Sequence, residues 1–326
     1  SSDVCSSDLF DYQVYTKFWP VIAVFCVIIM LVLFKWGTGP SSRPDARTWL
    51  SIGPINFQPS ELVKIGFIIT FGVHLDKVKE KINNIFSILQ LGAHAAVPIV
   101  LVAATGDMGS ALVFMVIAIV MMFVAGVHWG YFLGGIALVG AATPLIWTYV
   151  LKQLQKDRFL ALIYPDLYPD IIYQQQRGLN AIGAGGITGQ GLFKGAYTQA
   201  GAVPESQNDM IFSVVGEELG FIGCITALLL IVLITVRIIY VGKKSSEQST
   251  NLICTGMAAM IIGQMIINVG MCLMLLPVIG ITLPFFSAGG SSNLCVYLGI
   301  GIVMSIYRHN CDTGAVNIRV YDSLKK

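Results

Sequence analysis

Several ionisable residues interrupt long apolar stretches of the chain, and their types could perform acid–base chemistry on an anionic substrate. Glu61 and Lys64 follow Gln58-Pro59-Ser60, in which Pro59 and Ser60 indicate the start of a helix. A spacing of three residues places the carboxylate and the ammonium on the same helical face. The pair could therefore serve a substrate, or it could be an ordinary ion pair that stabilises a helix end by about 0.2–0.5 kcal/mol.

Two aspartates each precede an apolar stretch and could act on a substrate from there. Asp107 lies within TGDMGS at 105–110, and Asp209 ends PESQND at 204–209. An aspartate in this position also caps a helix and complements the positive end of its dipole. Capping and a role in chemistry are compatible, so the sequence leaves both open for each aspartate.

Two further carboxylates, Glu217 and Glu218, lie deeper in the apolar stretch that follows Asp209. At 1.5 Å per residue they would lie about 12 Å below Asp209 in a helix. Successive helical residues differ by about 100° in direction, so Glu217 would point about 80° from Asp209 and Glu218 almost opposite to it. We therefore expect Glu217 to be a buried carboxylate that shares a cavity with Asp209. Glu218 is expected to pair with a neighbouring helix or to stay protonated.

Two glycine-rich turns could bring backbone N–H groups close to an anion. The first, IGAGGITGQG at 182–191, includes Gly185 and Gly186 but lacks the Lys-Ser/Thr of a P-loop, and a flexible loop is the simpler interpretation. The second, SAGGSS at 287–292, offers Ser287 and Ser291 beside a predicted helix start. The four histidines are dispersed along the chain, and the seven cysteines lack the spacing of a metal or redox site.

The composition indicates which elements must position these residues. Of the 326 residues, 55% are hydrophobic and 12% are charged, which is about half the charged fraction of a soluble domain. Lipid must therefore cover much of the surface, while a net charge of +2 without basic runs excludes a nucleic-acid partner. Apolar stretches of spanning length predict an all-α polytopic membrane protein with about eight transmembrane helices, at about 18–36, 60–75, 86–104, 109–127, 129–150, 211–241, 251–276 and 289–307.

The distribution of basic residues predicts the orientation of these spans. Lysines or arginines follow the second, sixth and last stretches, so those connections are expected on the cytoplasmic side. The opposite side then carries 37–60, the turn at Asp107, a long polar loop at about 151–210 and the segment 277–288. Arg43 and Arg47 fall on that outer side, so the charge bias is imperfect. The candidate carboxylates, Lys64 and both glycine-rich turns gather at one face of the bilayer.

Five sequence blocks, in the same order, resemble the SEDS family (shape, elongation, division and sporulation), the peptidoglycan polymerases of the RodA, FtsW and SpoVE type. They are RTWL with FQPSE at 47–61, GDMGS at 106–110, AIGAGG at 181–186, PESQNDMIF with GEELG at 204–220, and LPVIGITLP with SAGGSS at 276–292. The resemblance covers about residues 18–308. Gly106, Met210 and Ala288 replace the residues common in the family, and none of these departures removes a charge.

The resemblance implies a fold of ten spans, of which this chain would lack the first two. Residues 1–17 are expected to be a start that looks like translated adaptor sequence, since Ser-Ser-Asp at 1–3 recurs at 6–8, plus a short lead-in. Residues 18–308 would form the transmembrane domain, with the large extracytoplasmic loop at about 151–210. Residues 309–326 would be a cytoplasmic tail.

The resemblance also implies an activity, namely polymerisation of lipid II at the outer leaflet of the bacterial plasma membrane. The transfer inverts the sugar, forms a β-1,4 bond and releases undecaprenyl diphosphate. Asp209 would be the base or the carboxylate that anchors a divalent cation, Mg²⁺ or Mn²⁺. Lys64, Arg47 and Arg158 would clamp the diphosphate, with Glu61 and Asp107 orienting that clamp or completing the cation site. The remaining expected substrate contacts are Gln58, Gly185, Gly186, Ser287 and Ser291.

Two other functions stay open on the sequence. Buried Glu217 and Glu218 would also suit a transporter, such as a flippase for the same lipid. Members of the family work with a class B penicillin-binding protein, so the chain could instead be a scaffold for that transpeptidase. The sequence does not distinguish roles in elongation, division and sporulation.

Overall fold

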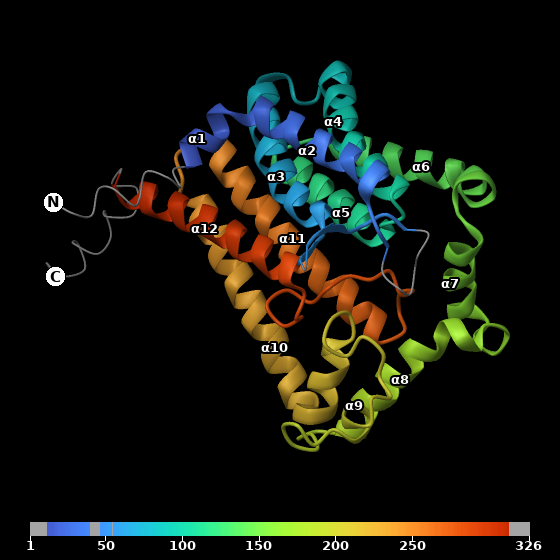
Figure 1. Cartoon of the computed structure of the whole chain (residues 1–326). Coiled ribbons are helices and arrows are strands. Elements are labelled where there is room, and N and C mark those ends of the chain that lie inside the picture. The colour runs from blue at the N-terminus through green and yellow to red at the C-terminus, as the bar shows by residue number, and fades with distance from the viewer. Residues whose placement is uncertain (1–11, 40–45, 54, 313–326) are drawn as a thin grey trace, which may run out of the picture. The chain divides into compact units, whose positions relative to one another are not determined.

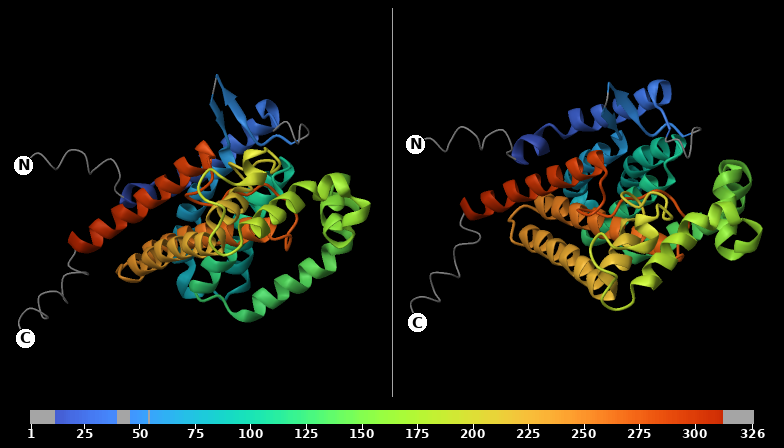
Figure 2. Two further views of the ribbon diagram at one scale, coloured as in Figure 1. Left: turned by 90° about the horizontal axis from the view of Figure 1, so that it is seen from below. Right: turned by 60° about the horizontal axis from the view of Figure 1, so that its bottom comes forward.

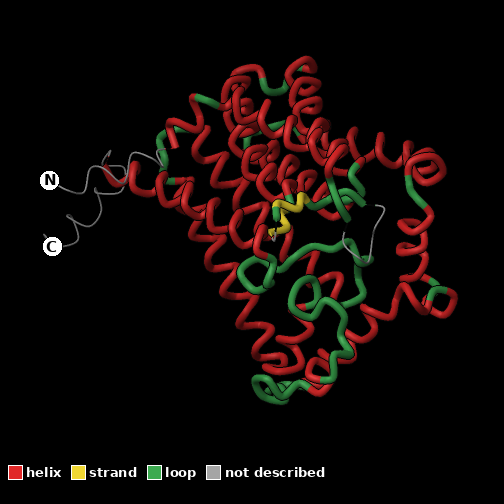
Figure 3. Tube along the Cα trace, viewed as in Figure 1, coloured by secondary structure: helices red, strands yellow, loops and turns green. Residues whose placement is uncertain are grey.

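The computed structural model describes residues 12–39, 46–53 and 55–312 (Figure 1). Within these ranges helices dominate, and the strands are confined to one antiparallel hairpin of β1 (Leu50–Ile52) and β2 (Ile55–Phe57), coloured yellow in Figure 3. The predicted all-α class is therefore confirmed, with this small hairpin as the addition. The chain divides into two compact units, one formed by residues up to 127, 233–262 and from 290 onward, the other by 128–232 and 263–289.

The first unit is built around α3 (Pro59–Val78), in which 15 of the 20 residues are buried. α2 (Trp19–Trp36), α4 (Ile85–Ala104), α5 (Met108–Val124) and α12 (Gly290–Asp312) all contact it. The short α1 (Tyr12–Lys17) and the 3₁₀ turn Lys79–Lys81 also contact α3. Because protein rather than lipid surrounds α3, this helix can carry charged residues at its start. The hairpin that leads into α3 can be followed in both views of Figure 2.

The second unit contains α6 (Trp129–Leu145) with a π-helical end at Ile146–Val150, followed by the polar connection predicted at about 151–210. That connection is largely helical. It contains α7 (Gln153–Ile163), a 3₁₀ turn (Pro165–Leu167), α8 (Pro169–Gly185) and α9 (Ala196–Gln199). The long helices α10 (Ile211–Lys243) and α11 (Gln248–Cys272) each contribute residues to both units.

Each of the eight predicted spans corresponds to a helix of the structure. Six of these helices are long and apolar enough to cross a bilayer, and α5 is a shorter apolar helix. α11 ends at Cys272 rather than near 276, because the N–H groups of Leu275 and Leu276 turn back to the carbonyl of Gly270 and Met274 has a φ of 57°. The multi-pass membrane architecture is therefore confirmed, with one helix end corrected. The predicted span at 60–75, now α3, is not among the helices of spanning length and hydropathy.

Parts of the predicted domain boundaries fall outside the described residues. This holds for most of the predicted adaptor-like start at 1–17 and for Arg43 in the outer segment. The predicted tail at 309–326 is described only to Asp312, and up to that residue it continues α12.

Candidate functional site

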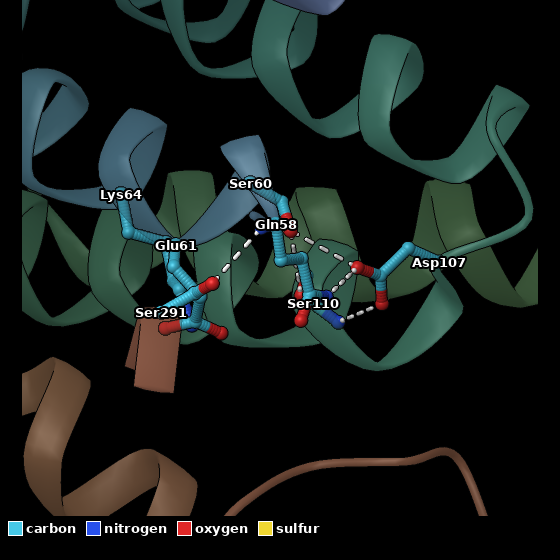
Figure 4. A network of polar contacts seen from close by, with 7 residues as sticks. All are labelled: Gln58, Ser60, Glu61, Lys64, Asp107, Ser110 and Ser291. Atoms are coloured by element: carbon cyan, nitrogen blue, oxygen red, sulfur yellow. Dashed lines mark hydrogen bonds and ion pairs between the residues drawn. The ribbon is translucent and has the colours of Figure 1, made fainter. Parts of the chain in front are cut away.

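Three helices of the first unit begin at one polar cluster, the α3 cluster, which consists of Gln58, Ser60, Glu61, Lys64, Asp107, Ser110 and Ser291 (Figure 4). Gln58 directly precedes α3, Asp107 precedes α5, and Ser291 lies in the first turn of α12. The backbone N–H of Gln58 donates to Ser291 Oγ at 3.1 Å, and its Nε2 donates to Asp107 Oδ2 at 2.8 Å. The three N-termini therefore meet, and each contributes a partial positive charge of about half a unit.

Asp107 is buried, and both of its carboxylate oxygens have partners. Oδ1 accepts from the N–H of Ser110 at 3.0 Å, which makes Asp107 the N-cap of α5. Oδ2 accepts from Gln58 and also from Ser60 Oγ at 3.1 Å. Asp107 therefore caps α5, as one of its two predicted roles required. The same carboxylate also joins the start of α5 to the start of α3.

Glu61 and Lys64 form an ion pair with 2.8 Å between Lys64 Nζ and Glu61 Oε1. The pair is buried, with Glu61 5% and Lys64 0% exposed, so the small energy expected for an exposed helical pair does not apply. Removing one partner of a buried pair leaves an uncompensated charge and costs about 3–5 kcal/mol. Lys64 therefore contributes its charge from inside the helix packing, and its direct contact with a diphosphate stays a prediction.

Arg47, the other cation predicted for this unit, lies at the junction of three segments. Its guanidinium donates to the carbonyl of Phe34 near the end of α2. Its backbone N–H donates to the carbonyl of Thr105, just before Asp107, at 2.8 Å. Arg47 is exposed on the surface, and its role toward a substrate stays a prediction.

In the second unit, Asp209 ends a turn just before α10, and a buried amide holds its backbone. Asn268 of α11 donates from Nδ2 to the carbonyl of Asp209 at 2.8 Å and to that of Ile281 at 2.7 Å. Asn268 is fully buried, while Asp209 is half-buried. One side chain thus joins the Asp209 backbone to the segment that follows α11.

The two carbonyls before Asp209 are held in the same way. Ser287 Oγ donates to the carbonyl of Asn208 at 2.7 Å and accepts from the N–H of Leu283 at 2.8 Å. The N–H of Ala288 donates to the carbonyl of Gln207 at 2.8 Å. Three consecutive carbonyls therefore all accept hydrogen bonds, and Cys272 Sγ adds a weak second one to Asp209. These bonds fix the backbone from which the Asp209 side chain projects. Ser287, predicted as a substrate contact, has this backbone role in the structure.

Glu217 and Glu218 both contact the loop that follows α8. The buried carboxylate of Glu217 accepts from the N–H groups of Tyr197 and Thr198, at 2.6 and 3.0 Å, and from Thr198 Oγ1 at 2.5 Å. Glu218 accepts from the N–H of Phe193 at 2.9 Å, not from the neighbouring helix expected from the sequence. Both glutamates therefore anchor this loop.

The remaining predicted residues of the second unit also have structural contacts. Gly185 ends α8 so close to the backbone of α10 that a side chain there would collide with the carbonyl of Gly216. Gly186 follows with a φ of 55°, which favours glycine. Arg158 donates from Nη1 to the carbonyl of Val278 at 2.7 Å. Substrate contacts of these three residues stay predictions.

The predicted carboxylates could hold a divalent cation only if substrate and water supply most of its ligands. Among the described residues no three His, Cys, Asp or Glu side chains converge, and the carboxylates of Asp107 and Glu61 are engaged by neighbours. Mg²⁺, however, usually binds through one or two carboxylates and takes its other ligands from water and substrate phosphates. Asp209 is a carboxylate that suits such a shared site.

Comparison with known proteins decides the family. The model of the FtsW/RodA/SpoVE cell cycle proteins matches residues 4–312, nearly the whole chain. The chain belongs to the FtsW/RodA/SpoVE family. This SEDS protein is 29% identical to the peptidoglycan glycosyltransferase MrdB of Escherichia coli over 300 residues, which cover 91% of the chain and 80% of MrdB. It is 31% identical to stage V sporulation protein E of Bacillus subtilis over 311 residues, covering 92% and 81% of the two chains. A probable peptidoglycan glycosyltransferase FtsW of Geobacter sulfurreducens is also 31% identical, over 299 residues that cover 91% of the chain and 79% of that FtsW.

Solved structures agree with this assignment of the SEDS protein. One, from a study of how a peptidoglycan synthase complex coordinates polymerization and crosslinking, superposes with a TM-score of 0.79 at 26% identity, covering 93% of this chain and 85% of that one. The crystal structure of RodA from Thermus thermophilus gives 0.67 at 24% identity, with 93% and 81% covered, and supports the fold.

Sequence reasoning missed two polar contacts in the spans of this SEDS protein. Asn268 lies within an apolar stretch. Polar residues are rare at membrane depth, and this was the only signal in the sequence that could have identified it. His74 and His94 are 20 residues apart in the sequence, yet α3 and α4 bring their Nδ1 atoms to 2.9 Å. Pairing between helices is not visible in the spacing of residues along one chain.

Proposed function

We propose that this SEDS protein polymerises lipid II into glycan strands at the extracytoplasmic face of the bacterial plasma membrane. The class of reaction follows from the family: the chain is a peptidoglycan glycosyltransferase, like its curated relatives. The identity of the substrate, the side of the membrane and the roles of single residues are parts of the proposal. The observation that supports it most is the polar turn at Asp209, whose backbone is held by three hydrogen bonds.

The proposed reaction is a single displacement at the anomeric carbon. A sugar 4-hydroxyl attacks C1, the C1–O bond to the diphosphate breaks, and the configuration changes from α to β. The hydroxyl proton goes to a general base, for which we propose the half-buried carboxylate of Asp209. The electron pair of the broken bond leaves with undecaprenyl diphosphate, so negative charge develops on the leaving group.

We propose that the α3 cluster stabilises this leaving group. The starts of α3, α5 and α12 converge there, and helix N-termini favour phosphate groups. Buried Lys64 offsets the charge of Glu61, and the carboxylate of Asp107 is satisfied by three donors. The positive ends of these helix dipoles are fixed in place and need no rearrangement as the charge develops. Arg47 and Arg158 are proposed as further contacts to the diphosphate, and Gln58 and Ser291 as contacts at its edge.

A divalent cation is proposed to act with Asp209. When bound, Mg²⁺ or Mn²⁺ would neutralise charge on the diphosphate oxygens. Asp209 would hold it through its carboxylate, with the fixed 207–209 turn setting the position of that carboxylate.

The purified chain with labelled lipid II in detergent tests this function. Detergent micelles have no two sides, so glycan strands formed there require an enzyme, whereas a flippase gives none. We expect strands in the presence of Mg²⁺ or Mn²⁺ and a loss of synthesis with a chelator that added cation reverses. Absence of strands in the presence of cation would contradict the polymerase. The transporter alternative depended on Glu217 and Glu218, whose carboxylates bind loop N–H groups in the structure.

A class B penicillin-binding protein is the proposed partner. A structure similar to this chain comes from a complex that coordinates polymerization and crosslinking. A transpeptidase that crosslinks new strands would be needed beside a polymerase that makes them, so scaffold and enzyme roles can coexist in one protein.

The amide that holds Asp209 allows a specific prediction. Asn268→Leu removes the amide that donates to the carbonyls of Asp209 and Ile281, and the carbonyl of Asp209 keeps the weak contact from Cys272 Sγ. We expect kcat to fall by about 10²-fold because a shift of about 1 Å in a reacting group has that effect. Gln175→Leu is the matched control. Gln175 is also buried and donates to two carbonyls, those of Met271 and Leu276, at 2.8 and 2.7 Å. Initial rates with lipid II and thermal unfolding in detergent measure both variants.

Both variants are expected to lose about 1–3 kcal/mol of stability, since each removes the amide that donates to two carbonyls. Only Asn268→Leu should lower kcat of the folded protein. Ser287 gives a second comparison, because Ser287→Thr keeps the hydroxyl that Ser287→Val lacks, at nearly equal volume. Equal rates in the Thr and Val variants, or an equal loss of kcat in the Asn268 and Gln175 variants, would show that these contacts do not position Asp209.

A further inference from the structure

Helix α10 is broken near its start, at Gly220, where φ is 67° and ψ is −165°. A break of this kind releases backbone groups from the helical hydrogen-bond pattern on both sides. The carbonyls of Glu217 and Glu218 lose their partners, and so do the N–H groups of Phe221 and Ile222. In lipid each such group costs several kcal/mol if it stays unpaired, so something must satisfy all four.

The loop after α8, residues 186–193, satisfies them. Two N–H groups of the loop donate to the helix carbonyls: Gln190 N–H to Glu217 O at 3.0 Å and Gly191 N–H to Glu218 O at 2.9 Å. Two carbonyls of the loop accept from the helix: Gly186 O from Phe221 N–H at 2.9 Å and Ile187 O from Ile222 N–H at 3.1 Å. Gly189 and Gly220 face each other at the contact, and a side chain on either would collide with the other segment. The glycine-rich motif at 182–191 therefore builds the loop into the helix break.

The length of α10 beyond the break indicates where the break lies in a bilayer. The part of α10 after Gly220 ends at Lys243, and Lys243 and Lys244 mark the expected cytoplasmic end. About 23 residues at 1.5 Å each make about 35 Å, slightly more than the roughly 30 Å of a hydrocarbon core. This part crosses the bilayer by itself, so Gly220 and the loop bonded to it are placed at the outer membrane–water boundary.

The loop exposes large apolar side chains at this height. Ile187 is 70%, Leu192 57% and Phe193 76% exposed, and Phe221 of α10 beside them is 64% exposed. Phe193 also has a φ of 58°, a conformation unfavourable for a residue with a side chain, and its N–H is held by Glu218. An exposed aromatic in a strained backbone is unfavourable in water, and Glu218 fixes it there.

We infer that loop 186–193 is a hydrophobic wedge that inserts Ile187, Leu192 and Phe193 into the outer leaflet of the bilayer. Beyond the break, the α10 span also exposes large apolar side chains, including Leu229, Leu230 and Leu233. Lys194 follows directly and can reach the lipid headgroups, as basic residues do beside aromatic anchors. The inference rests on the span assignment alone and does not require the proposed polymerase activity.

Fluorescence quenching by lipid tests the wedge. Phe193→Trp is placed in the full chain, which is reconstituted in nanodiscs whose phospholipid acyl chains carry bromine. The parent protein in the same nanodiscs supplies the emission of its five native tryptophans for subtraction. We expect the added emission to be shifted to the blue and to lose roughly half its intensity or more, because the ring lies at the acyl boundary. Gln199→Trp, at an exposed polar position six residues further along the chain and at the end of α9, is the control and should lose little.

Leu192→Trp provides a second reporter, for which we expect the same quenching. With two reporters, the insertion of the loop can still be tested if one variant fails to fold. Quenching at 193 and 192 no greater than at 199 would overturn the wedge. A blue shift that appears only after a transpeptidase is added, and not with lipid alone, would also overturn it, since the loop would then be a protein-docking surface.

Discussion

Asp209→Ala is expected to abolish lipid II polymerisation and to leave the fold intact. If Asp209 is the general base, its loss lowers the rate of glycan-strand synthesis by about 10²–10⁴-fold. A rate reduced this far should fall below what the assay detects. The fold should persist because the turn is held through the carbonyls of residues 207–209, and these bonds do not involve the side chain of Asp209. Glycan-strand synthesis from labelled lipid II and thermal unfolding in detergent measure the two quantities separately.

Two comparison variants sharpen this test. Asp209→Asn keeps the size of the side chain and removes its basicity, so it should be as inactive as the alanine variant. Asp166→Ala removes an exposed carboxylate from the same connection between α6 and α10 and should retain the parent rate. Substantial synthesis by both Asp209 variants would remove this residue from the chemistry and leave the polymerase assignment without its base.

The helices could be predicted from the sequence because lipid imposes a simple rule. Each of the eight apolar stretches became a helix, since a span must satisfy its backbone internally. Asp107 was also predictable, because a cap needs only a short polar residue before a helix, and its second role joins two helix starts. The spacing of Glu61 and Lys64 predicted their contact, but not their burial, which depends on the four helices around α3.

The break in α10 could not be predicted, and it changes the meaning of several residues. A single glycine within an apolar stretch is normally tolerated in a helix, so Gly220 gave no signal. The angle expected between Asp209 and Glu217 assumed one straight helix, but α10 begins only at Ile211 and Asp209 lies in the turn before it. The glutamates are instead held by residues 19 to 25 positions earlier in the chain. Contacts between such distant segments depend on the fold rather than on periodicity.

Lys64→Met is expected to destabilise the protein by about 3–5 kcal/mol, because Glu61 would keep a buried charge without its partner. The matched control is Lys79→Met. Lys79 pairs with Asp76 at the same i,i+3 spacing and 3.0 Å, but both side chains are partly exposed, so the expected loss is within about 1 kcal/mol. Thermal unfolding in detergent compares the two. Similar small losses in both would mean that burial of the Glu61–Lys64 pair does not govern its energetics.

The double variant Glu61→Leu with Lys64→Met separates stability from function at this pair. Replacing a whole buried ion pair by apolar residues is often neutral or stabilising, so the double variant should unfold near the parent temperature. If the pair serves only to hold α3, its polymerase rate should also recover. If Glu61 and Lys64 act on the diphosphate, as proposed, the double variant is stable and inactive. Full activity in this stable double variant would reduce the pair to a structural contact and leave the three converging helix N-termini as the remaining candidate for the diphosphate site.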